Sequence, residues 1–297
     1  MRIALAYLFI ILLWATTPLA IKWSADGSSF IFGVTARMSI GLVCILFMQL
    51  LMRQRMPWHS KAKRTYFAVA AQIYGAMMAV YWGAQFIPSG WISVIFGLCP
   101  FITAILSAIW LGERSLSWDK LLAYLLGIAG LAVIFHSALH INYNTAMGVL
   151  GILFAAILQV FSAVWVQRLH AQLPAISQVT GGLLFAVPCY LLTWWLIDGQ
   201  LPTTLPINGM VSILYLGLIA TPIGFALYYY ILTHLPATRV ALITLISPVL
   251  SLFIGHYLNN EAITSDIILG TGLILGALMM HSFVEQIKRL KRKASPL

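Results

Sequence analysis

Long apolar runs separated by short polar segments divide the whole sequence. Each run has about twenty residues, the length that an α-helix needs to cross the hydrocarbon core of a bilayer. Charged residues, Gly and Pro bound the runs, and we place spans at residues 3–22, 29–52, 66–86, 90–111, 119–136, 146–167, 177–197, 208–232, 239–258 and 266–284. The pattern predicts an all-α polytopic membrane protein with ten transmembrane helices.

One stretch of the sequence occurs twice, as Ile87–Glu113 and, without a gap, as Leu235–Glu261. Three pairs of residues keep the same spacing of 148 positions: Pro88 and Pro236, Pro100 and Pro248, and Glu113 and Glu261. Helix-disrupting and charged residues are rare in apolar runs, so their common spacing indicates that the chain holds two copies of one membrane unit.

Each copy would contain five helices. Because five is an odd number, the second copy must enter the membrane with the opposite orientation to the first. We expect residues 1–143 to form the first five-helix repeat, residues 144–287 the second, inverted repeat, and residues 288–297 a basic cytoplasmic tail. Inverted repeats often hold a substrate site near the bilayer midplane, so the layout favours transport, although a fold alone does not define a function.

The composition excludes a soluble domain. Hydrophobic residues make up 61% of the chain and charged residues 8%, against about 25% charged residues in soluble proteins. Seventeen Lys and Arg outnumber seven Asp and Glu. Because the basic residues lie between the apolar runs, we expect them to set the orientation of the helices in the membrane, and we predict no nucleic-acid partner. With the amino terminus in the cytoplasm, fifteen of the seventeen fall in cytoplasmic segments, so both termini are predicted to be cytoplasmic.

The four paired prolines are predicted to bend two helices. Pro88 and Pro236 precede their runs, and Pro100 and Pro248 lie inside them. An internal proline lacks the backbone donor, so we expect Pro100 to kink its helix and to free the carbonyl near Phe96. A free carbonyl at membrane depth requires protein or a water-filled cavity beside it. The prolines are therefore candidate hinges; the small polar residues nearby could equally serve close helix packing.

Polar and aromatic residues on several predicted helices are candidates for a substrate cavity. Rings supply apolar area, while hydroxyl and amide groups orient a ligand. The predicted substrate-binding residues are Trp14, Tyr74, Met78, Tyr81, Ser93, Gln159, Ser162, Trp165, Tyr229 and Thr244. Tyrosines near helix ends could instead belong to the aromatic belts at the membrane surface.

Charged residues inside the spans are few. Arg37 is the one unambiguous charge within a span, and it could form a structural ion pair, extend to the interface or contact an anionic substrate group. Glu113 and Glu261 fall at span ends, where we expect them to cap or pair with neighbouring helix starts. No Asp or Glu falls at mid-membrane, so an acidic proton relay is not visible in the sequence.

The sequence indicates neither a metal site nor an enzyme. His136 and His140 have the i, i+4 spacing of zinc ligands but no Cys or carboxylate beside them. Cys44, Cys99 and Cys189 are single residues in apolar spans. With no nucleophile and base constellation and no phosphate-binding loop, we predict no cofactor and no catalytic residue.

The chain resembles the drug/metabolite transporter superfamily, and specifically its EamA-type ten-helix members. The resemblance rests on WATTPLAIK from Trp14, on IPSGWIS, CPF and LGE in the first copy, and on LPATRVALI, SPVLS and NNE in the second. The chain departs from the family in Trp14-Ala15, where Trp-Gly is common, and in Asn260-Glu261, where Gly-Glu is usual.

The resemblance implies an inner-membrane carrier, often an exporter, of amino acids, related metabolites or amphiphilic drugs. It also implies a central cavity lined mainly by helices 1, 3, 4, 6, 8 and 9. The motif residues that carry over are Trp14, Pro88, Pro100, Glu113, Pro236, Pro248 and Glu261.

We therefore hypothesise an inner-membrane secondary transporter in the lipid bilayer that moves a small amphiphilic molecule by alternating access. An importer or an uncoupled facilitator is the alternative, and a membrane enzyme acting on lipid-linked substrates or a non-transporting membrane partner is a more distant one. The residues leave open the substrate, the direction, the coupling ion (a proton or none) and whether the protein is a monomer or a dimer.

Overall fold

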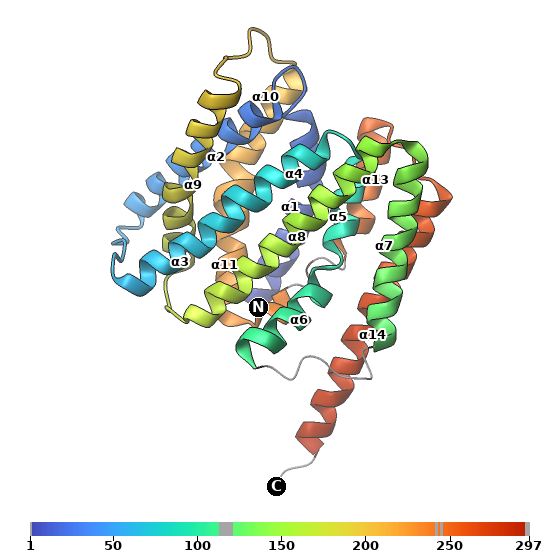
Figure 1. The fold of residues 1–297 in the computed structure, drawn as a ribbon. Helices are drawn as coiled ribbons and strands as arrows, with labels where there is room; N and C mark the ends of the chain where they lie inside the picture. Colours follow the sequence, from blue (N-terminus) through green and yellow to red (C-terminus); the bar gives the residue numbers. More distant parts are fainter. Residues whose placement is uncertain (1, 113–120, 241–242, 244–245, 295–297) are drawn as a thin grey trace.

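The computed structural model describes residues 2–112, 121–240, 243 and 246–294, and their regular secondary structure is helical throughout (Figure 1). The longer helices run side by side as a bundle. In chain order the elements are α1 (Arg2–Trp23), α2 (Phe30–Leu51), α3 (Ser60–Ala70), η1 (Ala71–Ala76), α4 (Met77–Ala84), α5 (Ser89–Phe96), α6 (Cys99–Leu111), α7 (Leu121–Ile141), α8 (Tyr143–Leu169), α9 (Ala175–Ile197), α10 (Ile207–Tyr215), η3 (Leu216–Gly224), α11 (Phe225–His234), α12 (Ala237–Val240), α13 (Ser247–Asn259) and α14 (Ser265–Ala294).

Eight helical segments of the described chain are long and apolar enough to cross a membrane. They are Ile3–Trp23, Phe30–Leu51, Ser60–Ala84, Ser89–Leu111, Leu122–Ile141, Tyr143–Leu169, Ala175–Ile197 and Ile207–His234, and Ser265–Met280 is a shorter apolar helix. These eight correspond to the first eight predicted spans. The ninth predicted span, residues 239–258, is described as α12 and α13, and residues 241–242 and 244–245 between them lie outside the described residues. Ten crossings therefore stay a prediction.

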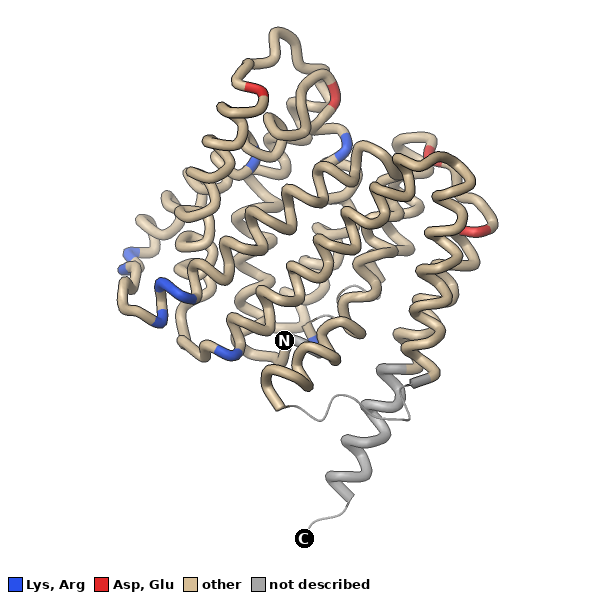
Figure 2. The backbone as a smooth tube through the Cα atoms, in the orientation of Figure 1, with Lys and Arg blue, Asp and Glu red and all other residues tan. Residues whose placement is uncertain are grey.

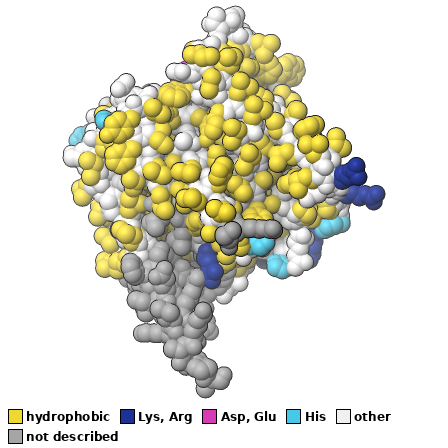
Figure 3. All heavy atoms as spheres, turned by 180° about the vertical axis from the view of Figure 1, so that it is seen from behind, with side chains coloured by type: hydrophobic (Ala, Val, Ile, Leu, Met, Phe, Trp, Pro, Cys, Tyr) yellow, Lys and Arg dark blue, Asp and Glu magenta, His cyan; other side chains and the backbone are white. Residues whose placement is uncertain are grey.

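The surface of the bundle is apolar over most of the face in Figure 3. Large hydrophobic side chains such as Val43, Leu50 and Trp195 are about two-thirds or more exposed, at 67%, 74% and 69%. A soluble protein would not expose so large an apolar area to water, whereas the hydrocarbon core of a bilayer accepts it. The chain is a multi-pass membrane protein.

Charges separate toward the two ends of the bundle (Figure 2). The acids whose side chains the structure describes, Asp26, Asp198, Glu261 and Asp266, lie where α1, α9 and α13 end and α14 begins. Arg53, Arg55 and Lys61 lie at the other end, between α2 and α3 or in the first turn of α3. We call the two ends the acidic end and the basic end. The positive-inside rule makes the basic end the predicted cytoplasmic side.

The bounds of several helices repeat at the spacing of 148 residues. α6 and α13 begin at Cys99 and Ser247 and end at Leu111 and Asn259, and each is followed by a residue with left-handed backbone, Gly112 at φ 64° or Asn260 at φ 51°. Two π-helical segments, η1 and η3, also end at equivalent residues. Segments of π-helix are rare and often lie near functional sites.

The prolines begin helices in this structure. Pro100 lies in the first turn of α6, where its missing N–H costs no hydrogen bond, and α5 has already ended at Phe96. The Leu98 carbonyl accepts the N–H groups of Phe101 and Ile102 at 3.0 and 3.2 Å. The expected kink is thus a full break between two helices. Pro248 lies in the first turn of α13, Pro88 directly precedes α5, and Pro236 directly precedes α12.

Candidate functional site

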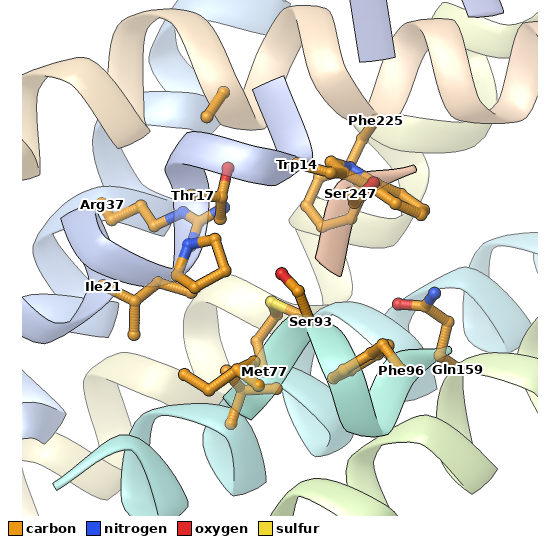
Figure 4. A pocket seen from close by; sticks show the side chains of 14 residues that line it. Trp14, Thr17, Ile21, Arg37, Met77, Ser93, Phe96, Gln159, Phe225 and Ser247 are labelled. Atoms are coloured by element: carbon orange, nitrogen blue, oxygen red, sulfur yellow. The ribbon is translucent and has the colours of Figure 1, made fainter. Parts of the chain in front are cut away.

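A part-enclosed cavity lies between helices from both halves of the chain (Figure 4). Its lining comes from α1, α2, α4, α5, α8, η3, α11 and α13. The cavity volume is about 80 Å³, several times the 10–15 Å³ that one water needs. The empty space between the lining side chains, including the part open to solvent, is about 680 Å³. This cavity is the candidate site.

Arg37 of α2 brings the one charged side chain among the described lining residues. It is 3% exposed, and its Nε donates to the Thr221 Oγ1 of η3 at 2.9 Å. Its Nη1 is buried and has no hydrogen-bond partner among the described residues. Figure 4 shows the side chain extending toward Thr17 and the interior of the cavity. A buried guanidinium with an unused donor is costly unless a ligand supplies an acceptor.

Gln159 of α8 lies on the other side of the cavity in Figure 4. Its Oε1 accepts the Gln72 Nε2 at 3.4 Å, and the Tyr229 hydroxyl donates to the Gln72 Oε1 at 2.7 Å. This chain of neutral groups connects α8, η1 and α11, and it orients the Gln159 amide at the wall. Only the Oε1 of Gln159 takes part in this series of hydrogen bonds. The Gln159 Nε2 is therefore available to donate to a ligand oxygen.

Apolar side chains fill the space between these two polar groups. Trp14 of α1 packs on Tyr228 with a ring-centroid distance of 5.4 Å, and Met77, Phe96 and Phe225 complete the apolar wall. Met77 and Phe225 are the first residues after the two π segments, at equivalent positions in the two copies. Such a cavity suits a small molecule with an apolar body and a polar end.

A hydrogen-bonded cluster lies at the acidic end. We call it the acidic-end network: Lys22, Ser89, Gly90, Asn259 and Glu261. The Glu261 Oε2 accepts the Ser89 hydroxyl at 2.9 Å and the Gly90 N–H at 3.3 Å, and its Oε1 accepts the Asn259 Nδ2 at 2.9 Å. The Lys22 Nζ lies 3.9 Å from the same carboxylate and donates to the Ile87 carbonyl at 2.9 Å.

The position of Glu261 has two stabilising effects. Its carboxylate accepts a first-turn N–H of α5, where the helix dipole also favours a negative charge. It also joins the end of α13 to α1 and to the start of α5. Gly255 makes this approach possible, because a Cβ there would lie 2.4 Å from the Glu261 Oε2. Glu113, the equivalent acid of the first copy, lies outside the described residues.

The structure brings together only part of the predicted binding set. Trp14, Ser93 and Gln159 line the cavity, and Thr244 lies outside the described residues. The cavity lining does not include Met78, which packs against the core, or Ser162, whose hydroxyl donates to the Ala68 carbonyl at 2.7 Å.

The predicted tyrosines and Trp165 also lie outside this lining. The Tyr74 and Thr193 hydroxyls are 2.7 Å apart, the Tyr81 hydroxyl accepts that of Ser24 at 3.4 Å, and Tyr229 reaches the site only through Gln72. Trp165 packs on Phe67 and Phe161 near the basic end. The hydroxyls of the three tyrosines join neighbouring helices. Periodicity alone does not distinguish such a contact between helices from a cavity face.

Two apolar lining residues were not predicted from the sequence. Met77 and Phe225 are 148 positions apart, so the repeat spacing relates them, although both are apolar and stand out in no composition pattern.

His136 and His140 lie 3.1 Å apart through their Nε2 atoms and are away from the cavity lining. The described residues hold no group of three or more His, Cys, Asp or Glu that could bind a metal.

A helical bundle with an apolar outer surface and a part-polar cavity between its two halves is the architecture of a membrane transport protein. Two segments of the chain, residues 1–136 and 146–283, match the model of the EamA-like transporter family. The chain belongs to this family and is a membrane transporter of the drug/metabolite transporter superfamily.

Several relatives carry transporter names. The chain is 24% identical over 284 residues to YoaV of Bacillus subtilis, described as an uncharacterized transporter; the match covers 95% of this chain and 97% of YoaV. It is 26% identical to a protein of Streptantibioticus cattleyicolor named as a probable terminal-alkyne amino-acid exporter, over 82% of this chain and 81% of that protein. It is 27% identical to a Salmonella typhimurium protein named as a probable amino-acid metabolite efflux pump, over 69% and 71%.

A solved crystal structure has the same fold. It superposes with a TM-score of 0.71 at 18% sequence identity and covers 96% of this chain and 97% of its own. At this identity the likeness describes the fold alone.

Proposed function

We propose that the protein is an exporter of small amphiphilic metabolites, amino acids or related compounds, across the cell inner membrane. The observation that carries the proposal is the cavity with one cationic group, one amide and an apolar wall between helices of both halves. The names of two relatives, an amino-acid exporter and an amino-acid metabolite efflux pump, support the substrate class and the direction.

Transport would occur by alternating access between two inverted repeats. The equal bounds of α6 and α13 and the matching ends of η1 and η3 support this mechanism, because equivalent segments can exchange conformations. The two states must differ by only a few kcal/mol, so that substrate shifts their populations. The basic end would face the cytoplasm together with both termini.

An uncoupled facilitator is the second candidate. The described lining residues include no Asp, Glu or His, so no side chain of ordinary titration range is available there to carry a proton. A carrier of this kind would move substrate down its own gradient in either direction. If transport requires a proton gradient, the group that carries the proton lies outside these lining residues.

Counterflow in liposomes tests the function directly. The full chain is reconstituted with a high internal concentration of one unlabelled amino acid, and uptake of the same labelled amino acid is followed with and without a proton gradient. We expect labelled uptake to overshoot equilibrium without the gradient, a result that requires a carrier. Lack of exchange across a panel of amino acids and amphiphilic metabolites, by protein with a cooperative melting transition, would contradict the proposal.

The proline breaks test alternating access. Ser247 lines the cavity, so Ser247→Cys in a background of Cys44→Ser, Cys99→Ser and Cys189→Ser gives one reporter thiol. We expect Pro100→Ala to change the ratio of thiol labelling from the two sides by about tenfold, which corresponds to about 1.4 kcal/mol between the two states.

Pro174→Ala is the matched control, because Pro174 also precedes a helix but is exposed and outside the cavity lining. It should leave the labelling ratio unchanged. Equal labelling ratios and equal transport in the unmodified reporter and in Pro100→Ala would remove the hinge role of this break.

A further inference from the structure

We propose that the Arg37 guanidinium is the anion-binding group of the cavity and that the transported substrates carry a single carboxylate on an apolar body. This inference rests on the proposed transport function and deepens it by naming the chemical group that is recognised. It separates the substrates of this protein from amphiphilic cations, which an apolar cavity with aromatic walls would otherwise accept.

The first argument is the unused hydrogen-bonding capacity of Arg37. The side chain is 97% buried, its Nε is committed to Thr221, and its Nη1 has no acceptor among the described residues. Buried polar groups are nearly always paired, so a nearly fully buried guanidinium at the cavity wall with an unpaired nitrogen is a candidate to bind a ligand that supplies an acceptor. A carboxylate oxygen is the acceptor that matches a guanidinium best, because the hydrogen bond is charge-assisted on both sides.

The second argument is the lack of a neutralising acid. The acids whose side chains the structure describes, Asp26, Asp198, Glu261 and Asp266, lie at the acidic end of the helices, and none of them is within 4.0 Å of the Arg37 guanidinium. The other described lining residues are uncharged at neutral pH. Arg37 stays protonated in proteins, so the empty cavity carries one uncompensated positive charge. The carboxylate of an incoming substrate would pair with this charge.

The charge count also distinguishes among anions. One guanidinium balances one carboxylate, whereas a phosphate monoester would bring about two negative charges to a single described cation. The remaining polar groups of the lining, such as Ser93, Gln159 and Ser247, are neutral. The geometry therefore favours a carboxylate over a phosphate ester as the anionic group.

The third argument is that the close packing of α2 on η3 does not depend on the Arg37 charge. Small residues already hold α2 against η3: a Cβ on Gly41 would lie 2.5 Å from the Thr221 Cγ2, and a Cβ on Gly217 would lie 2.8 Å from the Ile40 Cβ. Close packing of these helices thus comes from the glycines. A neutral side chain of similar length could fill the volume of Arg37, so helix packing by itself does not require the charge.

The fourth argument is the place of the apolar wall. Figure 4 shows Arg37, Thr17 and Ile21 on one side of the cavity and Trp14, Phe225 and Gln159 on the other. A substrate with its carboxylate at Arg37 would extend its apolar body between Met77 and Phe96 toward the aromatic rings. The far amide of Gln159 could receive a second polar group of the substrate.

Binding of three matched probes tests the inference. The probes are 3-phenylpropionate, 3-phenylpropionamide and 3-phenylpropylamine, which share one apolar body and differ in charge. Affinities are measured by calorimetry on the full chain in lipid nanodiscs at neutral pH. We expect the carboxylate to bind at least tenfold more tightly than the amide and the amine. Equal binding of the three probes, or preference for the amine, would overturn the inference without any variant.

Variants then assign the preference to Arg37. Arg37→Met should lower carboxylate affinity at least tenfold and leave amide affinity within twofold, while Arg37→Lys should retain part of the preference. Thr221→Val is the matched control, because it removes the structural hydrogen bond and keeps the charge; it should keep the preference. Equal loss of all three probes in Arg37→Met and in Thr221→Val would assign Arg37 a packing role and overturn the inference.

Thermal melting gives an independent readout. Because Arg37→Met removes an uncompensated buried charge, we expect its melting temperature in the absence of ligand to be equal to or above that of the unmodified protein. The carboxylate probe should raise the melting temperature of the unmodified protein but not that of the variant. A rise of the same size in both would contradict an anion site at Arg37.

The counterflow assay distinguishes this inference from the proposed function. Carboxylate-selective binding by a protein that exchanges no solute would support the anion site and contradict transport as proposed. Exchange of labelled amino acids by a protein that binds none of the three probes more tightly than the others would support transport and overturn the anion site.

Discussion

Two stretches of the molecule, residues 71–112 and 219–260, can be compared position by position. Each has a π segment that ends at Ala76 or Gly224, and a helix of thirteen residues that ends before a left-handed residue. Between these points α5 and α12 begin at the equivalent residues Ser89 and Ala237, but their first turns have different tertiary partners.

The starts of α5 and α12 contact side chains from different parts of the chain. The first turn of α5 receives the Glu261 carboxylate, and α5 packs closely on α13 through Gly90. For α12 the Arg239 carbonyl accepts the Tyr7 hydroxyl of α1 at 2.6 Å, and the N–H groups of Arg239 and Val240 donate to the Pro236 carbonyl. Similar local sequence thus starts the two helices at equivalent residues, while the packing of the whole chain gives each helix its own tertiary partner.

Among the variants that test this comparison, loss of the Glu261 carboxylate should have the largest effect on stability. Glu261→Ala leaves the buried Ser89 hydroxyl and the Gly90 N–H without their acceptor, so we expect about 2 kcal/mol of destabilisation and a lower melting temperature. Glu261→Gln keeps one acceptor oxygen and should cost about half as much. Both are measured by thermal melting in detergent.

Asp266→Asn is the control for Glu261. Asp266 is exposed in the first turn of α14, where loss of a charge costs less than about 1 kcal/mol. If Glu261→Ala melted within one degree of the unmodified protein, the network would not hold α5.

A methyl group at Gly90 should have the next largest effect. Gly90→Ala would put a Cβ 2.7 Å from the Leu252 Cδ2 and 2.9 Å from its Cα, so α5 and α13 must move apart. We expect a loss of about 1–2 kcal/mol, from overpacking, in the same melting assay. Leu252→Ala in the Gly90→Ala background should recover only part of this loss, because the backbone contact remains.

Gly276→Ala provides the contrast. It lies within α14 and would place its Cβ in open space, so the change should be neutral or stabilising by up to about 1 kcal/mol. Equal melting temperatures for Gly90→Ala and Gly276→Ala would show that α5 and α13 are not closely packed.

Substitution of the two residues with left-handed backbone should have the smallest effect on stability. Gly112→Ala adds a side chain at φ 64°, which we expect to cost about 1 kcal/mol, while Asn260→Gly at φ 51° should be neutral or stabilising by a few tenths of a kcal/mol. Melting of both variants checks the pair. Destabilisation by Asn260→Gly comparable with that of Gly112→Ala would indicate that the Asn260 side chain has a role of its own.

Much of the fold was predictable because membrane helices obey simple rules. Runs of apolar residues of the right length predicted eight of the long helices to within a few residues at most boundaries, and Pro100 marked the interruption between α5 and α6. The site was less predictable. Trp14, Ser93 and Gln159 stood out as polar or aromatic residues in apolar runs, while Met77 and Phe225 did not.

The candidate tyrosines show why residue type is insufficient. Tyr74, Tyr81 and Tyr229 have the hydroxyls and rings that a cavity could use, but their hydroxyls meet Thr193, Ser24 and Gln72 of other helices. A polar group at membrane depth needs a partner, and a protein partner satisfies it as well as a substrate does. Only the packing of the helices reveals which partner is present.

The sequence alone determined that the chain is a multi-pass helical membrane protein, with paired prolines and a charge pattern suited to one orientation. These properties depend on hydropathy and on local backbone chemistry, which are readable residue by residue. The tertiary structure alone decided that Arg37 of α2 meets Thr221 of η3 and faces the same cavity as Gln159 of α8. Such contacts join residues more than a hundred positions apart, and their positions depend on how side chains of all the helices pack together.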